Sequence, residues 1–377
     1  MILDRRQFLA GGAATAAALL ASTARAQEPL QPSPAERAKM AEAAEAFRKE
    51  HDVPGLAVAF TREGRLVHEA AFGLADRDSG EALTPAHRFR IASISKPVTA
   101  VAIFKLIEDG RLGLDDRVLG PEGLLGETYG KIAAGSHLRE ITVDHVLTHT
   151  SAGWPKDGTD PMFRAGLPDR QALIEATLAQ MPTRSAPGAD YAYSNFGYCL
   201  LGRVIERVSG LPYADYAKAA LLAPAGIADM EIAGNTLAER QPREARYHAR
   251  DRRDPYGIDV RRMDAHGGWI ASAASLARFA AAADGRWSPR LLKPESVAVM
   301  STPNPVNPAY ARGWNVNARG NAWHGGSLPG TATLMVRTAS GLTWAGLCNT
   351  RARETELARD LDRLLWTMAR AVPRWRA

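Results

Sequence analysis

Residues 89–110 read FRIASISKPVTAVAIFKLIEDG, and they contain one long apolar run. From residue 94 to residue 108 the segment is apolar on almost every side, which predicts a buried helix. A helix tolerates proline only near its start, so Pro97 places that start close to residues 93–95. Gly110 is typical of the position just beyond a helix C-terminus. The segment therefore predicts an interior helix that begins beside two serines and a lysine.

Ser93 and Lys96 lie three residues apart at this predicted helix start, so their side chains share one face. A serine hydroxyl becomes a good nucleophile only when a base removes its proton. Lysine can be that base if its pKa is lowered, and burial and the positive end of a helix dipole both lower it. The pair indicates nucleophilic catalysis, although a capping serine beside an exposed lysine is a second interpretation.

Strand patterns lie at both ends of the chain and helical patterns lie between them. The sequence predicts one sheet domain, with its sheet region at about 33–115 plus 266–377 and a helical region inserted at about 116–265. The elements expected outside the first helix are a helix at 33–50, strands at 55–60 and 65–73, strand-like segments at 323–330, 331–338 and 342–350, and a final helix at 354–371.

A second motif, Tyr193-Ser194-Asn195, lies on the predicted loop before an apolar helix that starts at about Phe196. A tyrosine there can exchange protons with a serine or a leaving group if cations lower its pKa. The Asn195 amide can hydrogen-bond a substrate carbonyl or hold the lysine in place. The alternative is a turn tyrosine that packs on the core beside an asparagine that caps the helix.

A third motif is His324-Gly325-Gly326-Ser327. Two glycines weaken a strand and usually mark a close approach by another chain or a ligand. A backbone N–H of this strand and the N–H of Ser93 would together form an oxyanion hole. His324 could bind substrate or relay a proton, and the alternative is a glycine bulge with an unrelated histidine.

Composition excludes several classes of protein. The 377 residues are 46% hydrophobic and 23% charged, which argues against a disordered chain or a coiled coil. The 47 lysines and arginines are interleaved with 41 acidic residues, which favours a charged surface over a nucleic-acid groove. The zinc signature HExxH, the nucleotide-binding glycine motifs and the GxSxG elbow of α/β-hydrolases are absent from the sequence. We therefore expect no nucleic-acid partner and no metal site. Cys199 and Cys348 lie in apolar segments, so buried free thiols are expected, although a pair between them stays open.

Residues 1–26 have the pattern of a cleaved export signal. Arg5 and Arg6 precede an alanine-rich apolar run, and residues 24–26 read Ala-Arg-Ala, which fits a cleavage site. The paired arginines indicate the twin-arginine route and thus a periplasmic or secreted location. An uncleaved anchor is the alternative. No later stretch has 18 apolar residues in succession, so we expect residues 27–377 to form one domain without stable membrane insertion.

In this order the three motifs resemble the serine β-lactamase and penicillin-binding protein superfamily, and within it the class C β-lactamase-like branch. The similarity covers about residues 35–370. It also includes VPGLAVAF (53–60), FRIASISKPVTA (89–100), VLTHTSAG (146–153), GGWIASAASLARF (267–279) and GWNV (313–316). The resemblance implies an α+β fold of the α/β-sandwich type, in which an antiparallel sheet is flanked by helices and an all-helical region is inserted. It implies a serine hydrolase that needs no metal or organic cofactor.

The resemblance also assigns roles to the residues that match the family's motifs. Ser93 would be the acylated nucleophile, and Lys96 and Tyr193 would share the general-base and general-acid work, with the division between them open. Asn195 would position the substrate and the lysine.

On the third motif, His324 takes the place of the lysine in the family's KTG motif. Gly326 and Ser327 would belong to the substrate-binding strand, and the backbone N–H groups of Ser93 and Ser327 would form the oxyanion hole. The reaction would acylate Ser93, release a leaving group and then hydrolyse the acyl-enzyme with water.

The third motif also departs from the family, because class C β-lactamases resemble YAN followed by KTG and this chain has YSN followed by HGG. Lysine is a fixed positive charge that pairs with a substrate carboxylate, whereas a histidine with an ordinary pKa near about 6.5 is mostly neutral at pH 7. HxG variants resemble the esterase, amidase and D-aminopeptidase members of the branch. We therefore expect an exported serine hydrolase that cleaves an ester or amide bond of a small molecule or peptide.

Three alternatives remain open for the function. They are β-lactam hydrolysis, cleavage of peptidoglycan peptides by a D-amino-acid peptidase or carboxypeptidase, and a sensor that is acylated without turnover. The physiological substrate and the oligomeric state also stay open.

Three further features have alternative interpretations. His145 and His149 have a spacing that can suit a metal, but no third ligand is evident and the resemblance makes them structural. Trp154 is a candidate for lining the pocket. The basic segment 243–262 is either a solvated loop or a rim that supplies positive charge near the site.

Overall fold

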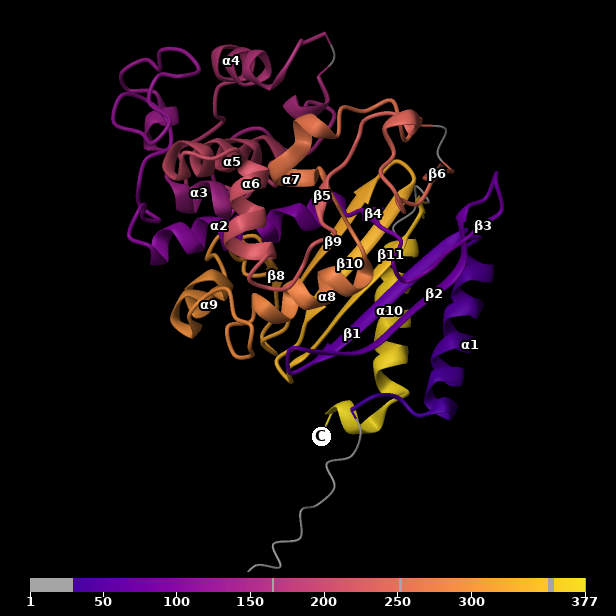
Figure 1. Ribbon diagram of the computed structural model, residues 1–377. Coiled ribbons are helices and arrows are strands. Elements are labelled where there is room, and N and C mark those ends of the chain that lie inside the picture. Colours follow the sequence, from indigo (N-terminus) through magenta and orange to yellow (C-terminus); the bar gives the residue numbers. More distant parts are fainter. Residues whose placement is uncertain (1–29, 165, 251–252, 352–355, 377) are drawn as a thin grey trace, which may run out of the picture.

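The computed structural model describes residues 30–376 except 165, 251–252 and 352–355. The expected export signal at 1–26 lies outside the described residues. Helices cover both faces of a central sheet, and a mainly helical region lies beyond one of these faces (Figure 1). The predicted α+β architecture is confirmed.

The main sheet has seven strands in the order β3-β2-β1-β11-β10-β9-β8, and every neighbouring pair is antiparallel. β1 (Gly55–Arg62) and β2 (Arg65–Asp76) form a hairpin whose turn residues Glu63 and Gly64 both have positive φ, the backbone that a tight hairpin requires. β1 also pairs with β11, so strands from the two ends of the chain lie side by side (Figure 1). The other strands of this sheet are β3 (Glu81–Ala82), β8 (Asn315–Val316), β9 (Ala322–Leu328), β10 (Thr331–Arg337) and β11 (Leu342–Cys348).

One face of the sheet is covered by α1 (Pro34–Glu50) and α10 (Glu356–Arg370), and the opposite face by α8 (Ala273–Ala282). Ser33 starts α1 as predicted. Its hydroxyl accepts the Glu36 N–H, and the Glu36 carboxylate accepts the Ser33 N–H, which satisfies two N-terminal donors. Large apolar side chains fill the space between sheet and helices on both faces.

The region beyond the α8 face of the sheet is mainly helical (Figure 1). α2 (Ser95–Glu108) follows the 3₁₀ turn η1 (Ala92–Ile94) and contacts α5 (Asn195–Ser209). Asn195 is the first residue of α5 and not a loop residue, because the Ser194 hydroxyl accepts the Gly197 N–H at 3.0 Å and caps the helix.

The remaining elements of the chain are short or peripheral. The helices and helical turns are η2 (His137–Glu140), α3 (Val143–Leu147), η3 (Pro161–Phe163), α4 (Arg170–Gln180), α6 (Tyr213–Ala217), η4 (Lys218–Leu222), η5 (Leu237–Glu239), η6 (Arg261–Met263), α7 (Asp264–Gly267), α9 (Pro294–Ser301) and η7 (Pro373–Arg376). The short strands are β4 (Phe89–Arg90), β5 (Glu231–Ile232), β6 (His248–Ala249), β7 (Trp269–Ala271) and β12 (Thr350–Arg351).

The interior helix predicted from the long apolar run is confirmed as α2. Its residues 95–104 are all buried, and Gly110 ends the segment with a φ of 67°. Lys96 is therefore carried into the protein interior at the N-terminal end of this helix. Over the part of the chain that the structure describes, no helix has both the length and the apolar composition that a membrane span requires.

Candidate active site

Ser93 lies on the strained turn between β4 and α2. Ala92, the residue before it, has a φ of 48°, a left-handed conformation that a non-glycine residue adopts at a cost in free energy. The Ser95 hydroxyl donates to the Ala92 carbonyl at 2.7 Å and closes the turn. Ser93 is half-buried while the residues on either side of it are buried, so it is the residue of this turn that solvent reaches.

Lys96 is completely buried, and its Nζ has three oxygen partners. They are Asn195 Oδ1 at 2.7 Å, the His266 carbonyl at 3.0 Å and Ser93 Oγ at 3.3 Å. Burial lowers the pKa of Lys96 well below its ordinary value, and the charge of Lys156 lowers it further. A neutral amine has two N–H groups and one lone pair. When the amide and the carbonyl oxygen accept both N–H groups, the lone pair faces the Ser93 hydroxyl, as a general base requires.

Tyr193 contacts both residues of the first motif. Its ring centroid is 4.8 Å from Lys96 Nζ, and its side chain hydrogen-bonds with Ser93. Burial raises the pKa of Tyr193, and the hydrogen bond with Ser93 opposes only part of that rise. The condition considered for this tyrosine, a pKa lowered by cations, is not met, because the loss of hydration is the largest effect and it raises the pKa. The phenol is protonated at neutral pH and is placed to donate a proton.

Asp160, which no motif singled out, determines how Asn195 is oriented. Asn195 Nδ2 donates to Asp160 Oδ2 at 2.7 Å, so the oxygen of the same amide faces Lys96. Asp160 is buried and also accepts the Met162 N–H at 3.0 Å at the start of η3. The sequence carried no signal for this contact, because Asp160 lies 35 positions from Asn195 in an irregular loop.

We expect Asp160→Ala to lower kcat by about ten- to a hundredfold and to change KM less. The reason is that a hydrogen bond to a charged group contributes about 1.5–3 kcal/mol, and without it the Asn195 amide is free to turn away from Lys96. Asp160→Asn keeps an acceptor oxygen and should recover most of the rate. Asp157→Ala, three residues away and exposed, is the control and should behave as the parent. Equal losses in the Asp160 and Asp157 variants would contradict the assignment.

His324 ends a chain of hydrogen bonds whose direction is set by the backbone. The Ser194 N–H donates to His149 Nδ1 at 3.1 Å, so His149 carries its proton on Nε2 and donates it to the Tyr310 hydroxyl at 3.2 Å. Tyr310 in turn donates to His324 Nε2 at 3.2 Å, and His324 Nδ1–H donates to the Gly325 carbonyl at 2.7 Å. Burial lowers the pKa of His324 to about 3, so this position carries no positive charge at neutral pH.

Gly326 lets β9 lie directly against η1, beside Ser93. A methyl group at Gly326 would overlap the Ile91 carbonyl oxygen and the Thr333 hydroxyl. Ser327 follows on the same strand, so the backbone of the third motif and the turn that carries the nucleophile are neighbours. The close approach expected of the two glycines is thus explained by Gly326, whereas a methyl group at Gly325 would have its nearest neighbour, the Thr333 carbonyl oxygen, at 3.7 Å.

We expect Gly326→Ala to lower kcat/KM by about a hundredfold, because even a 1 Å displacement of a reacting group can cost that much. Gly325→Ala is the matched control, one residue away on the same strand, and should retain at least half of the activity. Steady-state kinetics on one ester substrate would check both, with thermal melting to confirm folding. A Gly326→Ala variant as active as Gly325→Ala would show that the β9–η1 contact is unimportant.

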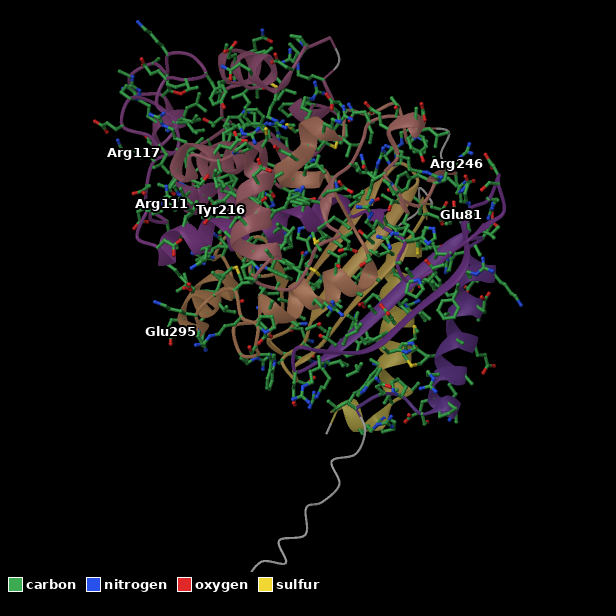
Figure 2. The ribbon with its side chains drawn as sticks, in the orientation of Figure 1. Glu81, Arg111, Arg117, Tyr216, Arg246 and Glu295 are labelled. Carbon is green, nitrogen blue, oxygen red and sulfur yellow. The ribbon has the colours of Figure 1, made fainter. Side chains whose placement is uncertain are left out.

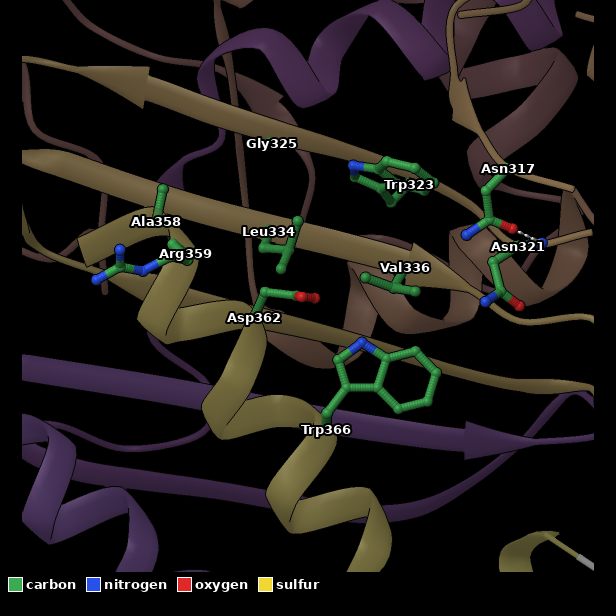
Figure 3. A pocket seen from close by; sticks show the side chains of 10 residues that line it. All are labelled: Asn317, Asn321, Trp323, Gly325, Leu334, Val336, Ala358, Arg359, Asp362 and Trp366. Carbon is green, nitrogen blue, oxygen red and sulfur yellow. Dashed lines mark hydrogen bonds between the residues drawn. The ribbon is translucent and has the colours of Figure 1, made fainter. Parts of the chain in front are cut away.

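Gly325 faces a separate groove of about 400 Å³ on the other side of β9, shown in Figure 3. Side chains alternate across a strand, which is why Trp323 and Gly325 face this groove while His324 and Gly326 face the site around Ser93. The residues that line it are Asn317, Asn321, Trp323, Gly325, Leu334, Val336, Ala358, Arg359, Asp362 and Trp366. They include no nucleophile beside a base, so this groove is not the catalytic site.

Trp154 and His145 both have structural roles away from the reactive residues. Trp154 does not line the site: it is buried against Phe196, and its Nε1–H donates to the Met181 carbonyl at 3.0 Å. His145 Nδ1 accepts the Thr142 N–H at 3.2 Å, which caps α3. Across the described residues, no three His, Cys, Asp or Glu side chains gather as a metal site.

The two cysteines, Cys199 and Cys348, are buried free thiols, as expected.

The amino-acid sequence is similar to the Beta-lactamase family, to a known esterase and to penicillin-binding proteins. A family model described as Beta-lactamase matches residues 40–365. Esterase EstB of Burkholderia gladioli is 32% identical over 241 residues, which are 60% of this chain and 59% of the esterase. Penicillin-binding protein 4 of Amycolatopsis lactamdurans is 32% identical over 194 residues, 52% of this chain and 49% of that protein. The chain therefore spans only about half to three fifths of these curated relatives.

Among solved structures, the D-amino acid amidase of Ochrobactrum anthropi SV3 complexed with L-phenylalanine amide superimposes with a TM-score of 0.74 at 21% identity. The alignment covers 91% of this chain and 100% of the amidase. At that identity the similarity supports the fold alone.

Proposed function

The chain belongs to the Beta-lactamase family, and from that premise we propose that it is a serine hydrolase that cleaves an ester or amide bond through an acyl-enzyme on Ser93. The observation that carries the proposal is the buried Lys96 amine, 3.3 Å from Ser93 Oγ, with two other oxygens placed to accept its N–H groups. Esterase EstB supports a reaction of this class. The export pattern in residues 1–26 supports a location outside the cytoplasm.

Acylation uses the protonation states that the site favours. The neutral Lys96 amine takes the Ser93 proton as Ser93 Oγ bonds to the substrate carbonyl carbon. The backbone N–H groups of Ser93 and Ser327 stabilise the oxyanion. When the oxyanion collapses, the bond to the leaving group breaks, Tyr193 donates its proton to that group and the Lys96 ammonium restores the phenol. Water then attacks the acyl carbon, releases the acid and regenerates Ser93.

The neutral His324 favours substrates that do not need a positive charge at this position. A β-lactam or a D-alanyl terminus carries a carboxylate that a fixed lysine would pair with, and the buried imidazole supplies no such charge. The His324 Nδ1–H donates to the Gly325 carbonyl, and its Nε2 accepts from the Tyr310 hydroxyl. Both ring nitrogens therefore already have hydrogen-bond partners within the protein. We therefore favour esters and amides whose recognition needs no cation at position 324 over β-lactams.

A paired assay tests this proposal. We expect turnover of 4-nitrophenyl butyrate and little or no turnover of a chromogenic cephalosporin. Fast cephalosporin hydrolysis would overturn the preference for esters and amides and favour a β-lactamase. If neither substrate turned over but intact-mass analysis showed a lasting mass gain on Ser93, the protein would instead be a sensor that is acylated without turnover.

A further inference from the structure

Lys156 is a second lysine beside the reactive residues, and none of the three motifs contains it. Its backbone N–H donates to the Tyr193 carbonyl at 2.7 Å, which fixes the loop against the second motif. Its Nζ lies 5.4 Å from the Tyr193 ring centroid. Unlike the buried Lys96, Lys156 is exposed, and its charge is close enough to lower the pKa of both Lys96 and His324.

No carboxylate among the described residues forms an ion pair with Lys156. The nearest acidic groups are engaged elsewhere. Asp160 accepts hydrogen bonds from the Asn195 amide and the Met162 N–H, and Asp157 accepts from Thr159. Lys156 therefore has no ion-pair partner among the described residues, and Asp160 attracts its charge only at longer range.

Two arginines of the basic segment 243–262 differ from Lys156 because each has an acidic partner. Arg246, which is labelled in Figure 2, pairs with Asp78 at 2.7 Å. Arg261 pairs with Glu239 at 3.0 Å. The cationic rim considered for this segment is thus balanced by acidic partners at these two arginines, whereas the cation beside Tyr193 is Lys156.

The surroundings of Lys156 favour an added negative charge. Partial loss of hydration lowers the pKa of Lys156, and the neighbouring Arg351 guanidinium lowers it further. A carboxylate bound beside the Lys156 ammonium group would oppose these effects through its negative charge. The ammonium group would act as a point charge toward such a group.

We propose that Lys156 binds a carboxylate on the substrate, so that the preferred substrates are esters or amides that carry a negative charge near the scissile bond. This inference rests on the proposed hydrolase function. It differs from recognition of a carboxylate at position 324, because His324 is buried and neutral while Lys156 is exposed beside Tyr193. Lys156 would be a specificity-determining residue outside the proton-transfer steps.

The test uses three chromogenic esters with the parent protein and Lys156→Met. They are neutral 4-nitrophenyl butyrate, 3-carboxy-4-nitrophenyl butyrate with the charge on the leaving group, and mono-4-nitrophenyl pimelate with the charge on the acyl group. We expect Lys156→Met to raise KM at least about tenfold for one or both anionic esters, and to change KM for the neutral ester less than about twofold. Lys156→Arg should retain most of the preference. Lys131→Met, at another exposed lysine, is the control and should change nothing.

Two outcomes would overturn the proposal. Equal changes for all three esters would mean that Lys156 acts only by shifting the pKa of Lys96. No change for any of them would mean that its charge is irrelevant to binding. Failure of the hydrolase proposal is distinguishable, because the parent protein would then hydrolyse none of the three esters.

Discussion

Replacement of Ser93 by alanine is expected to lower kcat/KM for 4-nitrophenyl butyrate by at least about 10⁴-fold, because loss of a serine nucleophile removes the covalent route altogether. The substitution deletes one oxygen from a half-buried side chain whose main chain is held by the surrounding turn, so the fold should be retained. Steady-state kinetics and thermal melting would measure the two effects. A melting temperature within about 2 °C of the parent would exclude unfolding as the cause.

Ser95→Ala is the matched control, since Ser95 lies two residues away in the same motif. Its hydroxyl is buried and donates to the Ala92 carbonyl instead of facing Lys96. It should keep most of the activity and lose some stability. Substantial activity in Ser93→Ala, or equal losses in both variants, would mean that the nucleophile lies elsewhere.

Replacement of Lys96 by methionine is expected to lower kcat by about 10³-fold, within the range that a positioned general base contributes. Methionine fills a similar volume but has no lone pair to accept the Ser93 proton. Lys105→Met on the same helix is the control, because Lys105 is partly exposed and pairs with Asp109 at 3.0 Å. Near-normal activity in Lys96→Met would assign the base role to another group.

The pH dependence separates a lost base from a damaged structure. The pKa of Lys96 is lowered, so in the parent protein kcat/KM should rise with pH as Lys96 loses its proton, and that acidic limb should vanish in Lys96→Met. The lowered pKa of Lys96 also makes the free energy of unfolding depend on pH, and the sign of this dependence is fixed. Between the lowered pKa of the folded state and the ordinary pKa of the unfolded state, the unfolded chain binds more protons, so the free energy of unfolding rises with pH. Lys96→Met should lack this contribution, as chemical unfolding at several pH values would measure.

Much of the architecture could be predicted because local patterns and global packing agree. The apolar run before Gly110 predicts an interior helix, and this prediction does not depend on which elements the helix packs against. Pro97 predicts the start of that helix to within about one residue of the observed start. Strand patterns at the two ends of the chain predicted one sheet, and β1 pairs with β11. The sequence predicts Asn195 on the loop, but Asn195 is the first residue of α5, because capping by Ser194 starts the helix one residue earlier.

The candidate site was predictable only where its residues belong to motifs. Ser93, Lys96, Tyr193, Asn195 and the third motif do come together. The contributions of Asp160 and Lys156 were missed, since a single charged residue in an irregular loop has no pattern. The sequence left the direction of the pKa shift of Tyr193 open, because that direction depends on the balance between burial and nearby charge.

The sequence by itself determined the family resemblance, the interior helix that carries Ser93 and Lys96, and the absence of a lysine at position 324. These follow from residue identity and from spacing along one helix or strand. Only the tertiary structure decided that Asp160 orients Asn195, that the third motif adjoins Ser93 through Gly326, and that Lys156 stands beside Tyr193 without an ion-pair partner among the described residues. The physical reason is that hydrogen bonds and charge interactions act over a few ångströms in space. Loops separated by tens of residues are brought within that range only when the apolar core between them has packed.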